Sequence, residues 1–142
     1  MKSKIIFFLT VFCIHLNAQN LTISTSGQTG TSGTNWSLSN NVLTITGNAD
    51  VNASVINNYL ANNNLSFSGV SNFIINADII WSSNRILTLN ASQNIFIYNN
   101  IAVGGDSAQL NLYYGGSNAS TAPNSIYFYT MSQRNRNKIS FT

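Results

Sequence analysis

The sequence predicts an all-β protein that winds as a parallel β-solenoid with about 22 residues per coil. The first observation is an apolar-polar-apolar triplet that recurs at successive spacings of 22, 22, 22 and 23 residues. Its five copies are Leu21-Thr22-Ile23, Leu43-Thr44-Ile45, Leu65-Ser66-Phe67, Leu87-Thr88-Leu89 and Leu110-Asn111-Leu112. Such alternation is typical of strands with one buried face, and a constant spacing indicates that strands of successive coils stack. Sandwiches and up-and-down barrels also alternate, but neither architecture enforces one spacing.

The second observation is that two further columns keep the same spacing. One column contains Val51, Phe73 and Ile95, and a shorter one contains Tyr59, Trp81 and Val103. Three strand-like segments per turn with a fixed register are what stacked coils require. Between residues 53 and 63, however, Val55-Ile56 and Tyr59-Leu60 have helical spacing, so the first full coil is expected to carry a helical turn in place of a strand.

The chain divides into three predicted parts. Residues 1–18 read as a signal peptide, because Lys2 and Lys4 precede an apolar run and a small residue stands at the expected cleavage site. Residues 19–41 are predicted to be an N-terminal cap or linker, and residues 42–142 the parallel coils, with an insertion near 116–124. The mature chain contains no stretch long and apolar enough for a membrane span.

Composition excludes several classes of protein. The chain has 24 Asn, 19 Ser and 12 Thr but no Glu, which is incompatible with a helical bundle. Without the predicted signal peptide it also lacks Cys and His and retains a net charge of +1. Cysteine or serine nucleophile systems, Cys/His zinc sites and electrostatic binding to nucleic acid are therefore not expected. The prediction is a protein with no catalytic residues, no cofactor and no metal.

Asn and Asp recur at the same spacing between the predicted strands. These residue types tolerate left-handed backbone conformations, and stacked amides hydrogen-bond along a sheet, so we interpret both columns as turn ladders. The two ladders are Asn40, Asn62, Asn84 and Asp106, and Asp50, Asn72 and Asn94. Two of the three aspartates are thereby explained by turn geometry, and no pair of carboxylates emerges for acid-base chemistry.

One outward stripe of apolar and aromatic side chains is the candidate contact surface. If Ile95 and Ile97 point inward, Phe96 and Tyr98 point outward. The predicted stripe consists of Ile74, Phe96, Tyr98, Tyr127 and Tyr129. Exposed aromatic side chains in a row bind sugar faces, partner chains or surfaces, whereas the alternative is that they stack between coils or are covered.

The segments Phe-Ile-Ile-Asn-Ala-Asp-Ile (73 to 79) and Leu-Thr-Leu-Asn-Ala-Ser-Gln-Asn-Ile-Phe-Ile (87 to 97) resemble the coils of filamentous haemagglutinin-type adhesins. The resemblance covers about residues 41–115. It implies a single-stranded right-handed parallel β-helix of four to five coils, export to the bacterial surface, and adhesion to cells, matrix or glycans. It supplies no catalytic residues, and the Asn-Pro-Asn-Gly stretch of the secretion domain of such adhesins is absent from this sequence.

These observations predict a secreted or cell-surface protein of bacteria, non-enzymatic, that acts in adhesion or surface assembly. The last triplet, Ile139-Ser140-Phe141, presents a strand edge, so end-to-end self-association through the C-terminal coil is expected, or continuation into further coils. Two alternatives stay open. One is a β-helix enzyme acting on polysaccharide, which needs clustered charges on one face, and the other is an ice- or crystal-surface binder, which needs a regular outward array such as Thr44, Ser66, Thr88 and Asn111.

Overall fold

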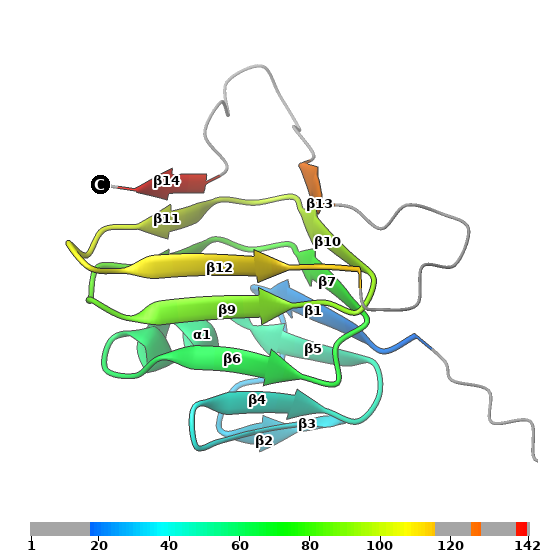
Figure 1. Cartoon of the computed structure of the whole chain (residues 1–142). Helices are drawn as coiled ribbons and strands as arrows, with labels where there is room; N and C mark the ends of the chain where they lie inside the picture. Colours follow the sequence, from blue (N-terminus) through cyan, green and yellow to red (C-terminus); the bar gives the residue numbers. More distant parts are fainter. Residues whose placement is uncertain (1–17, 116–125, 129–138, 142) are drawn as a thin grey trace, which may run out of the picture.

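The computed structural model describes residues 18–115, 126–128 and 139–141, which form three sheets and one helix (Figure 1). The five-stranded sheet contains, in spatial order, β13 (Ile126–Phe128), β10 (Asn94–Ile97), β7 (Asn72–Ile75), β1 (Asn20–Ser24) and β5 (Ala49–Asn52). The three-stranded sheet contains β14 (Ile139–Phe141), β11 (Ile101–Val103) and β8 (Ile79–Trp81). The six-stranded sheet contains β12 (Gln109–Tyr113), β9 (Ile86–Asn90), β6 (Leu65–Ser68), β4 (Val42–Ile45), β3 (Trp36–Ser39) and β2 (Ser32–Gly33). The helix, α1, spans Ala53–Leu60.

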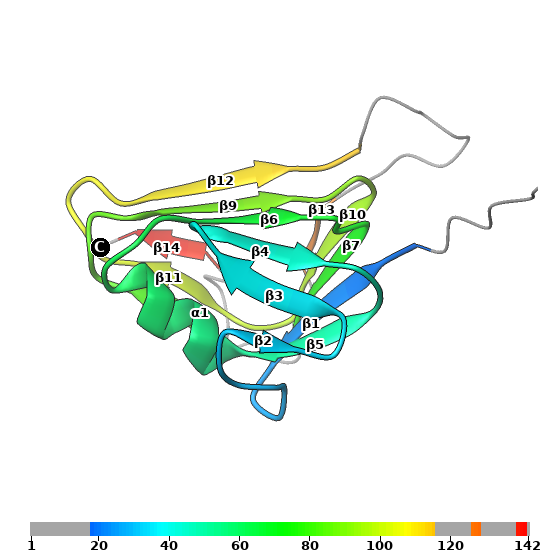
Figure 2. The ribbon, with the colours of Figure 1, turned by 90° about the horizontal axis from the view of Figure 1, so that it is seen from below.

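The three sheets surround one apolar core. Seen from below, they form the sides of a roughly triangular section, with α1 beside the three-stranded sheet and β3 crossing the lower end (Figure 2). From residue 65 onward, each successive group of three strands adds one strand to each sheet. Inward columns such as Phe73 beside Ile95 and Ile75 beside Ile97 fill the centre, and all four side chains are fully buried. Each such side chain contributes about 1.5–3 kcal/mol through its burial.

Alternation along the chain explains why these segments are strands. In β1, β4, β7 and β10 buried and half-buried residues alternate, as in any strand with one face on the core. The helix α1 instead buries Ala53, Ile56 and Leu60, a spacing of three and four residues that lines one helix face. Its N-cap is Asn52, whose Oδ1 accepts a hydrogen bond of 2.9 Å from the backbone N–H of Ser54. The helical turn predicted for residues 53–63 is thus confirmed.

The predicted fold class, a single-stranded right-handed parallel β-helix of four to five coils, is wrong. The sheets have mixed orientation, since β2 pairs with β3 and β3 with β4 in antiparallel fashion. Furthermore, β1 lies between β5 and β7, so the strand order of this sheet departs from chain order. The structure is mostly β, with the one helix α1 among fourteen strands in the described residues. The 22-residue spacing shows which residues are similar along the chain. It cannot predict a strand such as β1, which pairs out of chain order.

The register changes where the fold departs from the prediction. The pairs β6 with β9, β7 with β10 and β8 with β11 are parallel and 22 residues apart, as in Leu65 beside Leu87. Between β4 and β6, however, Leu43 lies beside Phe67, an offset of 24 rather than 22. The segment between these two strands contains α1, and a helical segment need not have the same number of residues as the strand that it replaces. The predicted alignment of Leu43 with Leu65 is therefore shifted by two residues.

The predicted N-terminal cap or linker at residues 19–41 contributes strands to two of the sheets. Its first strand, β1, pairs with β5 and β7, and β2 and β3 extend the six-stranded sheet at its lower edge. The hairpin between β3 and β4 turns at Asn40 and Asn41, whose φ angles of 50° and 67° suit a two-residue turn. The predicted insertion near 116–124 and nearly all of the predicted signal peptide at 1–18 lie outside the described residues.

The lower edge of β8 is covered by a side chain rather than by a strand. Asn57 of α1 donates from Nδ2 to the carbonyl of Asp78 at 3.4 Å and accepts at Oδ1 from the N–H of Ile80 at 3.0 Å. A side-chain amide offers the same donor and acceptor as a peptide group, so Asn57 satisfies one edge position as a neighbouring strand would. The helix thereby closes a sheet edge that otherwise invites pairing.

We predict that Asn57→Ala lowers the free energy of unfolding by about 1 kcal/mol relative to Asn58→Ala, because only Asn57 makes these edge hydrogen bonds. Both substitutions gain the same helix propensity, so the difference isolates the edge contacts. Urea unfolding of the two variants measures it, and amide hydrogen exchange should accelerate at Ile80 in Asn57→Ala alone. Equal stability of both variants would show that the amide contributes nothing.

Candidate functional site

The three aspartates of the chain occupy separate structural positions. Asp50 lies in β5 and accepts a 2.8 Å hydrogen bond from the Ser24 hydroxyl. Asp78 lies just before β8, and its Oδ1 accepts from the backbone N–H of Asn100 at 2.9 Å. Asp106 lies in the turn between β11 and β12. Asp50 and Asp78 therefore have structural hydrogen bonds, and each aspartate belongs to a different segment of the fold.

Within residues 18–115, 126–128 and 139–141, no group of three or more His, Cys, Asp or Glu side chains is placed to hold a metal ion. Arg85 is the one basic side chain in the described part of the chain.

An amide ladder runs across the five-stranded sheet at the start of three strands. Asn94 donates from Nδ2 to Oδ1 of Asn72 at 3.1 Å, and Asn72 donates from Nδ2 to Oδ1 of Asn20 at 2.9 Å. The predicted ladder of Asp50, Asn72 and Asn94 thus contains Asn20 next to Asn72, and Asp50 lies opposite Thr22 in the strand beyond. The difference follows from the position of β1 between β5 and β7.

The members of the other predicted ladder serve different turns. Asn40 lies in the antiparallel hairpin between β3 and β4, and Asn62 follows α1. Asn62, Asn84 and Asp106 precede equivalent strands of successive layers, β6, β9 and β12, and the turns that contain Asn84 and Asp106 are hydrogen-bonded to each other. There, Oδ1 of Asn84 accepts a 3.1 Å hydrogen bond from the backbone N–H of Ser107, which links the two turns.

The predicted aromatic stripe is only partly exposed. Ile74 and Phe96 lie side by side in register on β7 and β10, and both are half-buried, as is Tyr98. Phe96 is also level with Tyr127 of β13 in the backbone register. The side chain of Tyr127 and all of Tyr129 lie outside the described residues. The arrangement matches side-by-side packing of like residues along a sheet, which stabilises the pairing of strands.

The outward polar column considered for surface binding is not continuous. Thr88 lies between Ser66 and Asn111, but the neighbour of Ser66 in β4 is Val42, because Thr44 is level with Ser68. The shift follows from the 24-residue offset between β4 and β6. This face therefore mixes side chains of different size and lacks a regular array of threonines.

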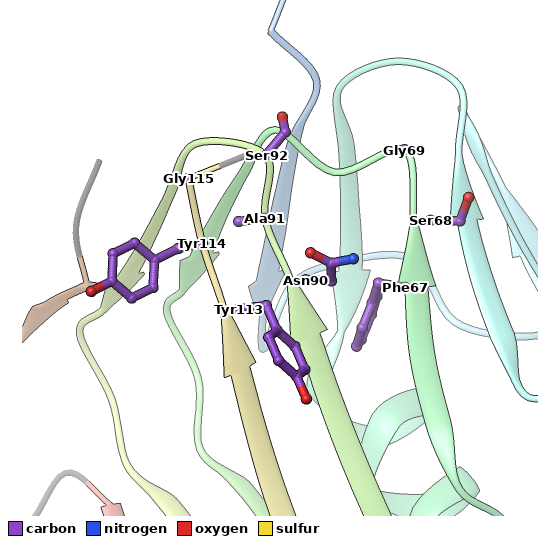
Figure 3. A pocket seen from close by; sticks show the side chains of 9 residues that line it. All are labelled: Phe67, Ser68, Gly69, Asn90, Ala91, Ser92, Tyr113, Tyr114 and Gly115. Carbon is purple, nitrogen blue, oxygen red and sulfur yellow. The ribbon is translucent and has the colours of Figure 1, made fainter. Parts of the chain in front are cut away.

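An open pocket of about 530 Å³ lies at the corner where β6, β9 and β12 end (Figure 3). Its lining comes from the last residues of these three stacked strands and from the turns after them: Phe67, Ser68, Gly69, Asn90, Ala91, Ser92, Tyr113, Tyr114 and Gly115. None of these residues carries a charge at neutral pH, and the volume lies within the usual range of small-molecule sites.

Two adjacent tyrosines dominate this corner. Tyr113 is 58% exposed and Tyr114 is 47% exposed, and their rings point away from each other on opposite sides of the chain (Figure 3). The Tyr113 side chain extends beside Asn90, its register partner on β9. Within the described residues, the one other large hydrophobic side chain with comparable exposure is Ile80, on the three-stranded sheet.

Two backbone hydrogen bonds tie the turns of this corner to the neighbouring strands. The N–H of Ala91 donates to the carbonyl of Tyr113 at 2.9 Å, and the N–H of Gly115 donates to the carbonyl of Gln93 at 3.2 Å. Beneath the pocket, Phe67 is buried and packs edge-on against Phe73 with ring centroids 5.1 Å apart. The floor is therefore a rigid part of the core.

The sequence patterns did not predict a site at this corner. The signal was present, because Tyr113 follows Leu110-Asn111-Leu112 and strand alternation places its side chain outward. The predicted contact surface was instead the longest aromatic stripe, whose members Ile74, Phe96 and Tyr98 are half-buried. Exposure at the end of a strand depends on which strands lie above it, and this is a property of the tertiary structure.

The chain matches no family model, no curated protein and no solved structure. The resemblance to filamentous haemagglutinin-type adhesins therefore stays a prediction. In the described part of the chain, no helix has the length and hydrophobicity that a membrane crossing requires.

We predict that Phe96→Ala lowers the free energy of unfolding by about 1 kcal/mol, because Phe96 packs beside Ile74 within the sheet. Tyr113→Ala should change it by less than about 0.5 kcal/mol, because the ring is mostly exposed. Thermal or urea unfolding of both variants measures the contrast. A destabilisation by Tyr113→Ala as large as that by Phe96→Ala would assign Tyr113 to the core instead.

Proposed function

We propose that this protein is an exported, non-enzymatic binding protein that attaches to neutral glycans of a cell or matrix surface through the tyrosine corner, defined as Tyr113, Asn90, Ser68 and Ser92. The observation that carries the proposal is an exposed tyrosine ring beside an uncharged pocket whose polar groups are amides and hydroxyls.

The chemistry of this corner suits a carbohydrate. A sugar ring has an apolar face of C–H groups, which packs on an aromatic ring, and a rim of hydroxyls, which need donors and acceptors. Tyr113 offers the ring, and the Asn90 amide offers both a donor and an acceptor next to it. Because the pocket has no charge, it suits a neutral sugar better than a phosphate, a nucleotide or an acidic peptide.

A second pocket, of about 380 Å³ between the N-terminal loop and α1, supports binding less well. Its aromatic residue, Tyr59, is half-buried, and its hydroxyl already donates to Oδ1 of Asn41 at 2.9 Å and accepts from the N–H of Asn41 at 3.0 Å. The Tyr59 hydroxyl therefore already makes two hydrogen bonds that stabilise the β3–β4 hairpin. By contrast, the Tyr113 ring extends into solvent.

The remaining support comes from the composition. The predicted signal peptide indicates export, and a surface of Asn, Ser and Thr with few charges favours contacts by hydrogen bonds over long-range attraction. A protein of this kind binds through many weak contacts to a repetitive surface. Adhesion to polysaccharide fits these properties.

We predict that the purified chain binds neutral polysaccharides, and that Tyr113→Ala weakens this binding about tenfold, which corresponds to about 1.4 kcal/mol. Asn90→Ala should weaken it less, since a hydrogen bond on the rim of an open site exchanges with water. Isothermal titration with the polysaccharides selected on a glycan array measures both effects.

Ile80→Ala is the matched control, because Ile80 is a similarly exposed apolar residue on another sheet. It should leave binding unchanged. If no neutral glycan binds, or if Ile80→Ala and Tyr113→Ala weaken binding equally, the tyrosine corner is not a carbohydrate site.

A further inference from the structure

The two ends of the stacked sheets are closed very differently. At the lower end, β3 and β2 extend the six-stranded sheet past β4 in antiparallel pairing, and Asn57 covers the edge of β8. The edge of β5 is covered by Gln28, whose N–H donates to the carbonyl of Asp50 at 3.0 Å and whose carbonyl accepts from Asn52 at 2.9 Å. The lower edges of β5 and β8 therefore each have a covering group, and the six-stranded sheet ends in β2, a strand of only two residues.

The upper edge of the six-stranded sheet is β12, and within the described residues no strand pairs with its outer side. The N–H of Gln109 donates to the carbonyl of Arg85, and the carbonyl of Tyr113 accepts from Ala91, so the odd-numbered residues of β12 face β9. Backbone groups of neighbouring strand residues point in opposite directions. The N–H and C=O groups of Leu110 and Leu112 thus point along the sheet, away from β9.

This edge lacks the features that keep strands apart. The strand reads Gln-Leu-Asn-Leu-Tyr and contains no charged residue and no proline. Natural proteins usually place charged residues or proline on exposed edge strands, where they prevent pairing with another chain. Leu110 and Leu112 pack against the core yet are only partly buried. A further strand at this edge would complete both their backbone pairing and their burial.

We infer that the upper edge of β12 pairs with β12 of a second copy of this chain, antiparallel, about a two-fold axis at Asn111. The lower end is closed to head-to-tail addition, so a symmetric contact between two upper ends is the arrangement left for identical copies. This inference goes beyond the proposed glycan binding and does not depend on it.

The pairing is complementary at every position. Centred on Asn111, each Leu110 lies opposite Leu112 of the second copy, and each of these two pairs exchanges two N–H···O bonds. Both leucines lie on the core side, so apolar faces meet apolar faces. On the outer side, Gln109 lies opposite Tyr113 of the second copy, and Asn111 lies opposite Asn111 in a pair that forms no backbone bonds, with Cα atoms about 4.5 Å apart.

The test uses charge at the symmetry axis. Asn111→Lys and Asn111→Asp each place two like charges side by side in the symmetric pair, whereas a mixture of the two variants places opposite charges there. We expect sedimentation velocity to show a dimer for the unmodified chain. Each variant alone should dissociate at least about tenfold more readily, and the equimolar mixture should associate again.

The substitutions should not disturb the protomer, because the Asn111 side chain makes only a 3.4 Å contact with Thr88. Circular dichroism and thermal unfolding of each variant check this. As a second route that needs no charge, Asn111→Cys should form an intermolecular disulfide under mild oxidation, because the paired Cα atoms lie within disulfide range.

Three results would overturn the inference. The first is a monomer at all concentrations with Leu110 and Leu112 amides protected from exchange, which would mean that the chain covers its own edge. The second is a series of oligomers larger than the dimer. The third is a dimer that both charged variants retain.

Discussion

The hydrogen-bonded register between successive layers is the constraint on which the rest of the structure depends. Strands β9, β10 and β11 each lie on the strand 22 residues earlier, and a slip of one residue would turn Phe73, Ile75, Ile95 and Ile97 out of the core together. The side-chain hydrogen bond between Asn94 and Asn72 holds neighbouring layers in register at one corner, and the hydrogen bond from the Ser107 N–H to Asn84 does so at another. Core, corners and exposed faces therefore follow from one repeated offset.

A structure built by adding strands also has to close its edges, and the lower end shows how this chain does so. The six-stranded sheet closes by reversing direction at the Asn40-Asn41 turn, the three-stranded sheet closes with a side-chain amide, and the five-stranded sheet closes with a single backbone bridge at Gln28. The Gln28 side chain also accepts from Trp36 Nε1 at 3.0 Å, so two of these covers are joined to each other. Three different solutions at one end indicate that covered edges matter to the fold.

The sequence predicted what depends on neighbours along the chain. The 22-residue spacing gave the correct partners for β6, β7 and β8, and the helical spacing around Ile56 gave α1. It failed for β1, because nothing in a spacing marks a strand inserted between β5 and β7. It also failed for Leu43, because α1 changes the offset to 24. The tyrosine corner was missed for a related reason, since the exposure of Tyr113 depends on which strands surround it.

Scarcity of charge links the proposed binding to the proposed assembly. With one arginine and three aspartates, the described part of the protein has little long-range attraction for a surface, and the proposed glycan binding at the tyrosine corner depends on weak short-range contacts. The same scarcity leaves β12 without the charges that prevent edge pairing. In a two-fold pair the outer face of β12 continues into the second copy, so two Tyr113 side chains lie on one continuous sheet. Two weak sites on one rigid particle bind a repetitive polysaccharide far more tightly than either site alone, because the second contact forms at high effective concentration.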